Sequence, residues 1–210
     1  MNGSVLVLLR HGATEWSEDA RFTSRTDVGL SAGGVIEAES AAAAVASANL
    51  SWSRILSSPA ARALATAELV AAHLGGLRPV VDERLREVDF GPFEGTTVAE
   101  AETGELAEAF AQWRRREGPS FPAGAETFRD AAKRAQAVFD DLRRSDGNIL
   151  VVGHGYSLRL MIAECVLAMP LPEMRRLRLD TGRFAVIRFE DDVPRLWLFN
   201  VADLALASTG

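Results

Sequence analysis

Two short apolar runs in this chain end in nearly the same corner. Residues 5–9 read Val-Leu-Val-Leu-Leu and lead into Arg10-His11-Gly12, while residues 148–152 read Asn-Ile-Leu-Val-Val and lead into Gly153-His154-Gly155. Apolar runs without alternation predict strands that are covered on both faces, which is typical of a parallel sheet between layers of helices. Two such strands, far apart in the chain, favour an α/β fold.

Helical and extended patterns alternate along the rest of the chain, as that fold class requires. We expect helices over about 31–48, from Ser57-Ser58-Pro59 to Gly75-Gly76, over about 125–145, and from Gly155 to before Pro170. Serine is a common N-cap and proline suits the first helical position, so the second helix is predicted to begin at Ser-Ser-Pro. Strands are expected at 54–57 and 79–81, with a hairpin formed by 184–189 and 196–199 around the linker 191–194.

The composition fits one domain over residues 1–210. Of the 210 residues, 48% are hydrophobic, which is enough for a core, and 25% are charged. The stretch at about 89–124 breaks the alternation with glycines, prolines and a short helical pattern. We interpret it as a cap-like excursion over one face of the domain and not as a second domain.

Charge and hydropathy exclude several classes of partner. The net charge is -6 and there is no basic stripe, which argues against nucleic acid binding. No apolar run is long enough to span a membrane, and Arg10 and His11 end the first run too early for a signal peptide, so a cytoplasmic protein is predicted. The single cysteine, Cys165, is expected to be a buried structural thiol. A homo-oligomer remains open.

The two matched histidines are the first candidates for chemistry. If the two strands are neighbours, His11 and His154 face one crevice at the carboxyl ends of the sheet, where ligands bind in open α/β folds. A glycine after each histidine lets backbone amides approach a ligand closely. His73, the third histidine, falls near the end of a predicted helix, where a cation suits the helix dipole.

A histidine can attack phosphorus as a nucleophile. The phosphoryl oxygens then need cations and hydrogen-bond donors around them, for which Arg10 and Arg62 are candidates. The leaving oxygen needs a proton donor, commonly a carboxylic acid. Local chemistry does not choose among the four nearby acids, which are Glu83, Glu87, Asp89 and Glu94.

These residues stand in blocks that resemble the histidine phosphatase superfamily, the phosphoglycerate mutase-like enzymes. The opening block is residues 9–16, Leu-Arg-His-Gly-Ala-Thr-Glu-Trp. The later blocks follow in the family's order: 25–34, Ser57-Ser58-Pro59 with Arg62 and Thr66, Glu87 with 89–95, 122–126, and Gly153-His154-Gly155. The resemblance runs from about Val5 to Val201, and several blocks in order are far more specific than one.

The resemblance implies a three-layer α/β/α sandwich around a mainly parallel sheet, and hydrolysis of a small phosphorylated metabolite without a metal or organic cofactor. It implies that His11 is the phosphorylated nucleophile and that Glu87 is the general acid and then the base. It implies that Arg10, Arg62 and His154 bind the phosphoryl group. The chain departs from the family at 17, 20, 23 and 24, which leaves the substrate open; Ser17 and Thr23 are expected to line the phosphate pocket.

Three alternatives remain beside a phosphatase. Mutases of the family resemble one another in a longer segment after the acid, with added arginines, whereas residues 87–122 are compact here. Arg114, Arg115 and Arg116 could hold an anionic tail, although such runs are more often a solvated helix face. A metal-dependent hydrolase that uses His11, His154 and carboxylates lacks tight ligand spacing, and a non-catalytic phosphate-binding protein would not need every chemical position filled.

Overall fold

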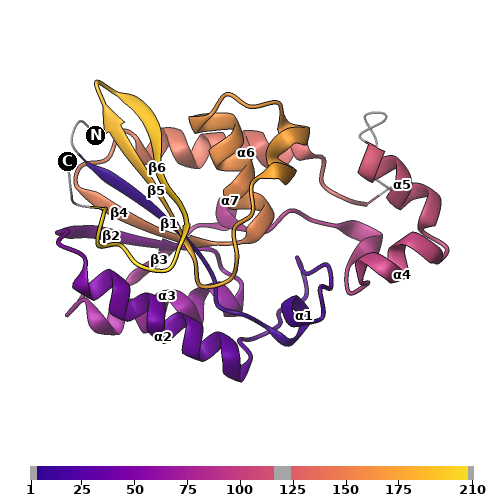
Figure 1. Cartoon of the computed structure of the whole chain (residues 1–210), viewed down its shortest axis with the longest axis horizontal. Coiled ribbons are helices and arrows are strands. Elements are labelled where there is room, and N and C mark those ends of the chain that lie inside the picture. The colour runs from indigo at the N-terminus through magenta and orange to yellow at the C-terminus, as the bar shows by residue number, and fades with distance from the viewer. Residues whose placement is uncertain (1–3, 116–123, 208–210) are drawn as a thin grey trace.

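A six-stranded mixed sheet organises the part of the chain that the structure, a computed structural model, describes, which is residues 4–115 and 124–207 (Figure 1). The strand order is β3-β2-β4-β1-β5-β6. The first four strands in that order are parallel, whereas β5 is antiparallel to β1 and β6 to β5. The strands are β1 (Val5–Arg10), β2 (Trp52–Ser57), β3 (Pro79–Val81), β4 (Asn148–Gly153), β5 (Phe184–Glu190) and β6 (Val193–Val201).

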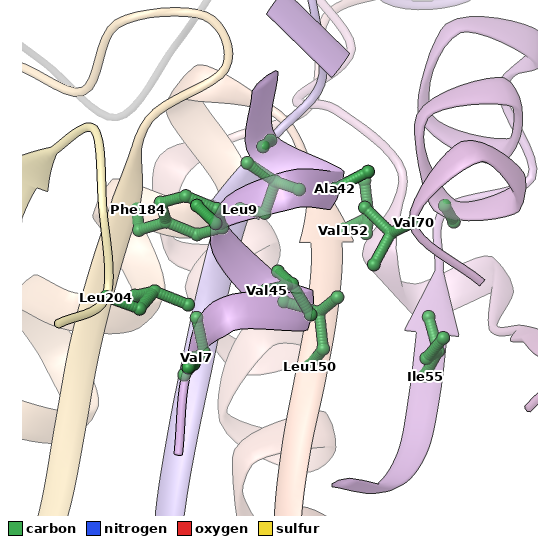
Figure 2. Close-up of a cluster of buried hydrophobic side chains, with 14 of the residues drawn as sticks. Val7, Leu9, Ala42, Val45, Ile55, Val70, Leu150, Val152, Phe184 and Leu204 are labelled. Atoms are coloured by element: carbon green, nitrogen blue, oxygen red, sulfur yellow. The ribbon is translucent and has the colours of Figure 1, made fainter. Parts of the chain in front are cut away.

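The continuous apolar runs of β1 and β4 are buried on both faces, as predicted. Side chains alternate across a strand, so Val7 and Leu9 join one core cluster while Leu6 and Leu8 join another. The first cluster lies beneath α2 (Ala32–Ser47) and α3 (Ala61–His73), and Figure 2 shows α2 side chains over β1 and β4. The second cluster lies beneath α6 (Phe128–Leu142) and α7 (Gly155–Met161).

The three layers of the predicted sandwich are therefore present. Figure 1 shows α2 and α3 on one face of the sheet and α6 and α7 on the other. The helix α2 begins where it was expected, because Ser31 caps it by accepting a hydrogen bond from the Gly34 amide. The helix α7 continues into a π-helical turn, Ile162–Val166. None of the described helices is both long and apolar enough to cross a membrane.

The predicted start of α3 at Ser57-Ser58-Pro59 is wrong. The helix begins at Ala61, and its N-cap Ala60 makes no side-chain hydrogen bond. Both serine hydroxyls are engaged elsewhere: Ser57 donates to the carbonyl of Ser58, and the Ser58 hydroxyl reaches His154. The predicted end is confirmed, since α3 ends at His73 just before two glycines with positive φ.

The C-terminal hairpin has a tighter turn than the linker 191–194 suggested. Asp191 and Asp192 take left-handed φ values of 49° and 63°, and Pro194 already pairs with Phe189 inside β6. Two consecutive left-handed residues match the twist of the flanking strands. Proline is tolerated because β6 is an edge strand of the described sheet.

The excursion after β3 contains two helices, α4 (Val98–Thr103) and α5 (Ala107–Arg115), preceded by short 3₁₀ turns at Glu83–Leu85 and Gly91–Phe93. An aromatic cluster joins this excursion to the helix layer, because Phe22, Phe93, Phe110 and Trp113 pack together with Leu160 of α7. In Figure 1 α4 and α5 lie beside α1 (Glu15–Glu18), away from the strands.

The two residues for which we expected structural roles lie away from the strand-end corners. The side chain of Cys165 packs against the second core cluster, and burial raises the pKa of its thiol to about 12. His73, at the end of α3, is largely exposed and lies 3.9 Å from a carboxylate oxygen of Glu39.

Candidate active site

The two matched histidines meet at the carboxyl ends of neighbouring strands. The strands β1 and β4 pair in parallel with Arg10 opposite Gly153, so the residues that follow them lie side by side. The ring centroids of His11 and His154 are 5.0 Å apart, edge to face. His11 is 5% exposed and His154 is fully buried. The two rings are therefore in contact, as neighbouring strands predict, but His11 lines a cavity whereas His154 is not among the residues that line it.

A hydrogen bond to the main chain fixes the tautomer of His11. Its Nδ1 lies 2.7 Å from the carbonyl oxygen of Gly12, and a carbonyl oxygen accepts hydrogen bonds and does not donate them. Nδ1 therefore carries the proton, and Nε2 keeps its lone pair. His11 lines a cavity of about 300 Å³, so an unprotonated ring nitrogen is available there as a nucleophile.

The charge state of both rings follows from their surroundings. Burial lowers the pKa of His11 well below 6.5, and the charges of Arg10 and Arg62 lower it further. Burial also lowers the pKa of His154 well below 6.5, and His11, Arg62 and Arg10 lower it further. Both imidazoles are therefore neutral near pH 7.

The Ser58 hydroxyl orients the second histidine. Its Oγ lies 2.7 Å from Nε2 of His154 and accepts a hydrogen bond from the Ala60 amide at 3.3 Å. Nε2 is the acceptor for the hydroxyl proton among the described residues, so we assign that proton to the bond with Nε2. Nδ1 of His154 then carries the ring proton, and it is buried without a partner among the described residues.

The two predicted arginines are anchored by main-chain carbonyls. Nη1 of Arg10 donates to the carbonyl of Leu179 at 2.8 Å. The Arg62 guanidinium donates to carbonyls of residues 23, 24 and 26 at 3.3–3.5 Å. Neutral carbonyls hold both guanidinium groups, and the carboxylate that acts most strongly on each is Glu87 in the same cavity. The cavity therefore offers two cations beside one acid, an arrangement that suits a phosphoryl group.

The structure separates Glu87 from the other three acids. Its carboxylate accepts hydrogen bonds from the amides of Tyr156 and Ser157 at 3.0 and 2.8 Å, at the start of α7, and it lines the cavity beside His11. The other acids face different partners: Glu83 pairs with Arg86, Asp89 pairs with Arg25, and Glu94 accepts the amides of Ser24 and Thr26. Glu87 is therefore the acid of the four that a ligand in this cavity would meet.

Ser17 and Thr23 line the same cavity, as expected, but their hydroxyls are engaged within the protein. The Ser17 hydroxyl donates to the carbonyl of Thr14 and accepts its amide, which caps α1. The Thr23 hydroxyl donates to the carbonyl of Arg21 at 3.1 Å. Both residues shape the wall, and their contact with a phosphate stays a prediction.

The glycine after His11 acts differently from what we expected, whereas Gly155 lines the cavity and its approach to a ligand stays a prediction. The Gly12 amide donates to Thr66 Oγ1 at 3.2 Å, so it is not directed at a ligand. A Cβ on Gly12 would lie 2.2 Å from the carbonyl oxygen of Gly34 in the first turn of α2. A Cβ on Gly155 would lie 3.3 Å from the Arg10 guanidinium. The glycines permit close packing of a helix and of an arginine.

Sequence reasoning missed part of the cavity wall. Ser58 was interpreted as a helix cap, and no site role was given to Tyr156 or Arg159, although both follow the second histidine within about one helical turn. That spacing was the available signal. Arg114 and Arg115 end α5, with side chains that lie outside the described part, and Arg116 lies outside the described residues. Residues 4–115 and 124–207 contain no cluster of three or more His, Cys, Asp or Glu residues that could hold a metal ion.

A sequence model of the histidine phosphatase superfamily (branch 1) matches residues 6–202. The chain belongs to the histidine phosphatase superfamily. It is 34% identical to a 2,3-bisphosphoglycerate-dependent phosphoglycerate mutase from Azorhizobium caulinodans over 195 residues, which cover 90% of this chain and 93% of the relative.

Solved structures of superfamily phosphatases share the whole fold. The alpha-ribazole phosphatase from Shigella flexneri matches with a TM-score of 0.82 and 26% identity, covering 95% of this chain and 97% of that one. The phosphoserine phosphatase from Entamoeba histolytica also gives a TM-score of 0.82 and 26% identity, over 94% and 97% of the two chains. This histidine phosphatase superfamily member thus resembles both phosphatases and a mutase, which supports a phosphatase or phosphotransferase activity.

Proposed function

We propose that this protein is a phosphatase that hydrolyses phosphate monoesters of small metabolites through a phosphohistidine on Nε2 of His11. The observation that carries the proposal is the state of that ring. His11 is neutral near pH 7, its Nδ1 is tied to the Gly12 carbonyl, and it lines a cavity together with two arginines held by carbonyls. A neutral imidazole beside two fixed guanidinium groups is suited to attack phosphorus.

The first step transfers the phosphoryl group to the protein. The lone pair of His11 Nε2 forms the N–P bond while the bond from phosphorus to the ester oxygen breaks. Glu87, as a carboxylic acid, gives its proton to that leaving oxygen, and the alcohol departs. Arg10, Arg62 and the Nδ1–H of His154 donate to the phosphoryl oxygens, over which negative charge spreads.

The second step releases phosphate. The Glu87 carboxylate takes a proton from a water molecule, whose oxygen forms the new bond to phosphorus while the N–P bond breaks. Nε2 of His11 regains its lone pair and Glu87 ends protonated, so the site returns to its starting state. No metal ion is required by this scheme, and the substrate is a small phosphorylated metabolite acted on in the cytoplasm.

A phosphoglycerate mutase-type transferase is the second candidate, favoured by the identity to the Azorhizobium relative. In a mutase the phosphoryl group returns to a second hydroxyl and not to water. Glu87 would then serve the acceptor hydroxyl as base. The residues of the first step are the same, so the fate of the phosphohistidine separates the two candidates.

The test is hydrolysis of p-nitrophenyl phosphate in EDTA by the wild type and His11→Ala, with trapping of acid-labile phosphoprotein. Turnover and a trapped phosphohistidine are expected in the wild type, and neither is expected in the variant. Turnover by a folded His11→Ala protein would defeat the covalent scheme, and loss in EDTA that added metal restores would favour a metal-dependent hydrolase. If no hydrolysis is found but a phosphoryl group is transferred between phosphoglycerates, the protein is a mutase.

A further inference from the structure

Arg159 is a third arginine in the same cavity, and it is held as rigidly as the other two. Its Nε donates to the carbonyl of Gly155 at 2.6 Å and its Nη1 to the carbonyl of Leu177 at 3.0 Å. The guanidinium lies over the ring of Tyr156, 4.6 Å from its centroid. Such anchoring means that little side-chain freedom is lost when a ligand binds.

The charge of Arg159 is not cancelled within the described part of the chain, where its polar partners are the two carbonyls and Tyr156. Arg21, which lines the same cavity, provides the contrast. It donates to the Glu100 carboxylate at 3.1 Å and lies 3.6 Å from that of Asp19. A cavity cation that makes no ion pair with a carboxylate is suited to bind an anion.

The position of Arg159 differs from that of the phosphoryl-binding arginines. Arg10 and Arg62 are the cations that act on His11, and Arg159 is not among the charges that do so. Arg159 instead acts on Arg10 and on Tyr156. Because its guanidinium lies over the Tyr156 ring, Arg159 is on the Tyr156 side of the cavity.

We propose that Arg159 is a subsite for a second anionic group, carried by the leaving group of the substrate. The inference rests on the proposed hydrolysis of phosphate monoesters, and it narrows the substrate class to phosphorylated acids. Apart from the two carbonyls and Tyr156, the guanidinium has no polar partner among the described residues, and its planar edge fits the two oxygens of a carboxylate. A cavity of about 300 Å³ lies at the small end of ligand sites, so the acid is short.

The test compares binding of two phosphonates that differ by one terminal carboxylate, 3-phosphonopropionate and propylphosphonate, by calorimetry. Phosphonates are not hydrolysed, so binding is measured independently of turnover. The wild type is expected to prefer 3-phosphonopropionate by about 10- to 100-fold, the range of a charged hydrogen-bonded pair. Arg159→Met, which keeps a long side chain over Tyr156, is expected to lose that preference while its affinity for propylphosphonate stays unchanged.

Two further variants sharpen the result. Arg159→Lys restores the charge without the fork and is expected to regain part of the preference. Arg21→Met removes a positive charge from the same cavity, but one already paired with Glu100, and is expected to keep the full preference. Thermal unfolding confirms that each variant is folded.

Other outcomes overturn the subsite. Equal binding of the two phosphonates by the wild type, or no binding of either, would contradict it. A loss by Arg159→Met that is equal for both would instead assign Arg159 to the transferred phosphoryl group. If the binding preference appears as expected but no phosphate monoester is hydrolysed, the subsite stands and the hydrolytic function fails.

Discussion

The hydroxyl of Ser58 lies 2.7 Å from Nε2 of His154 and so determines which nitrogen of that ring carries its proton. With Nε2 accepting from the hydroxyl, Nδ1 presents an N–H to an anion in the site. In the proposed reaction His154 donates to the phosphoryl group from Nδ1, and this requires the tautomer that Ser58 favours. Ser58 is thus a positioning residue, and its effect should be visible in the state of the ring.

Ser58→Ala is expected to lower turnover by roughly 5-fold, because the loss of one hydrogen bond of about 1 kcal/mol lets His154 populate the other tautomer. Nitrogen NMR of labelled histidine reads the tautomer directly. The control is Ser57→Ala, another buried serine whose hydroxyl donates to the carbonyl of Ser58 and does not touch the ring. An unchanged tautomer in Ser58→Ala would remove this role.

Glu87→Gln is expected to lower turnover of alkyl phosphates by about 10²- to 10⁴-fold, because an amide cannot protonate the leaving oxygen. The loss should be much smaller with p-nitrophenyl phosphate, whose leaving group is a stable anion without a proton. The measurement is kcat/KM for both substrates, because this ratio reports formation of the phosphohistidine and not the later step in which Glu87 activates water; phosphate affinity checks the binding site. Glu83→Gln, at an acid paired with Arg86, is the control. Equal losses on both substrates would contradict general-acid catalysis by Glu87.

Stability is expected to fall as the pH drops below about 6.5, the ordinary histidine value. Burial lowers the pKa of His11 and His154 in the folded protein, so below 6.5 the unfolded chain binds protons that the folded chain does not. The free energy of unfolding should then decrease by up to about 1.4 kcal/mol per pH unit for each histidine, until the folded-state pKa is reached.

Denaturant unfolding at a series of pH values between about 5 and 7.5 measures this slope. His11→Asn and His154→Asn should each remove the contribution of one histidine from the slope. A wild-type slope that neither substitution changes would contradict the assignment. The same low pKa keeps His11 unprotonated, so kcat/KM should not lose its nucleophile until the pH is well below 6.5.

Gly12→Ala is expected to destabilise the protein by at least about 1–3 kcal/mol, because the new methyl group would overlap the carbonyl of Gly34 at 2.2 Å. Relief requires a shift of α2 or of the corner that carries His11, so activity should fall as well. Gly29→Ala is the matched control, since a Cβ there meets nothing within 4 Å. Thermal unfolding and turnover are measured together, and wild-type values for Gly12→Ala would contradict this packing.

The sequence predicted the framework of the site well, because that framework depends on local patterns. Continuous apolar runs identified β1 and β4, and the histidines that follow each run located the crevice. It could not choose among the four acids from local chemistry, because the choice depends on Tyr156 and Ser157, which meet Glu87 across a large separation in the chain.

Ser58 and Arg159 show the second limit of sequence reasoning. A Ser-Ser-Pro segment fits a helix cap as well as it fits a site residue, and His154, the partner of the Ser58 hydroxyl, is distant in sequence. Arg159 is one of many arginines, and its lack of a carboxylate partner within the described residues becomes visible when its neighbours Gly155 and Leu177 are placed. Roles that depend on what a side chain does not contact require the assembled fold.

The strand order also has a consequence for biosynthesis. β1 lies between β4 and β5, so β1 has neither neighbour until synthesis has passed residues 148–153 and 184–190. During that interval an apolar strand with two open edges is a template for wrong pairing with other chains. A chain truncated before β4 leaves both edges of β1 unpaired and should therefore aggregate.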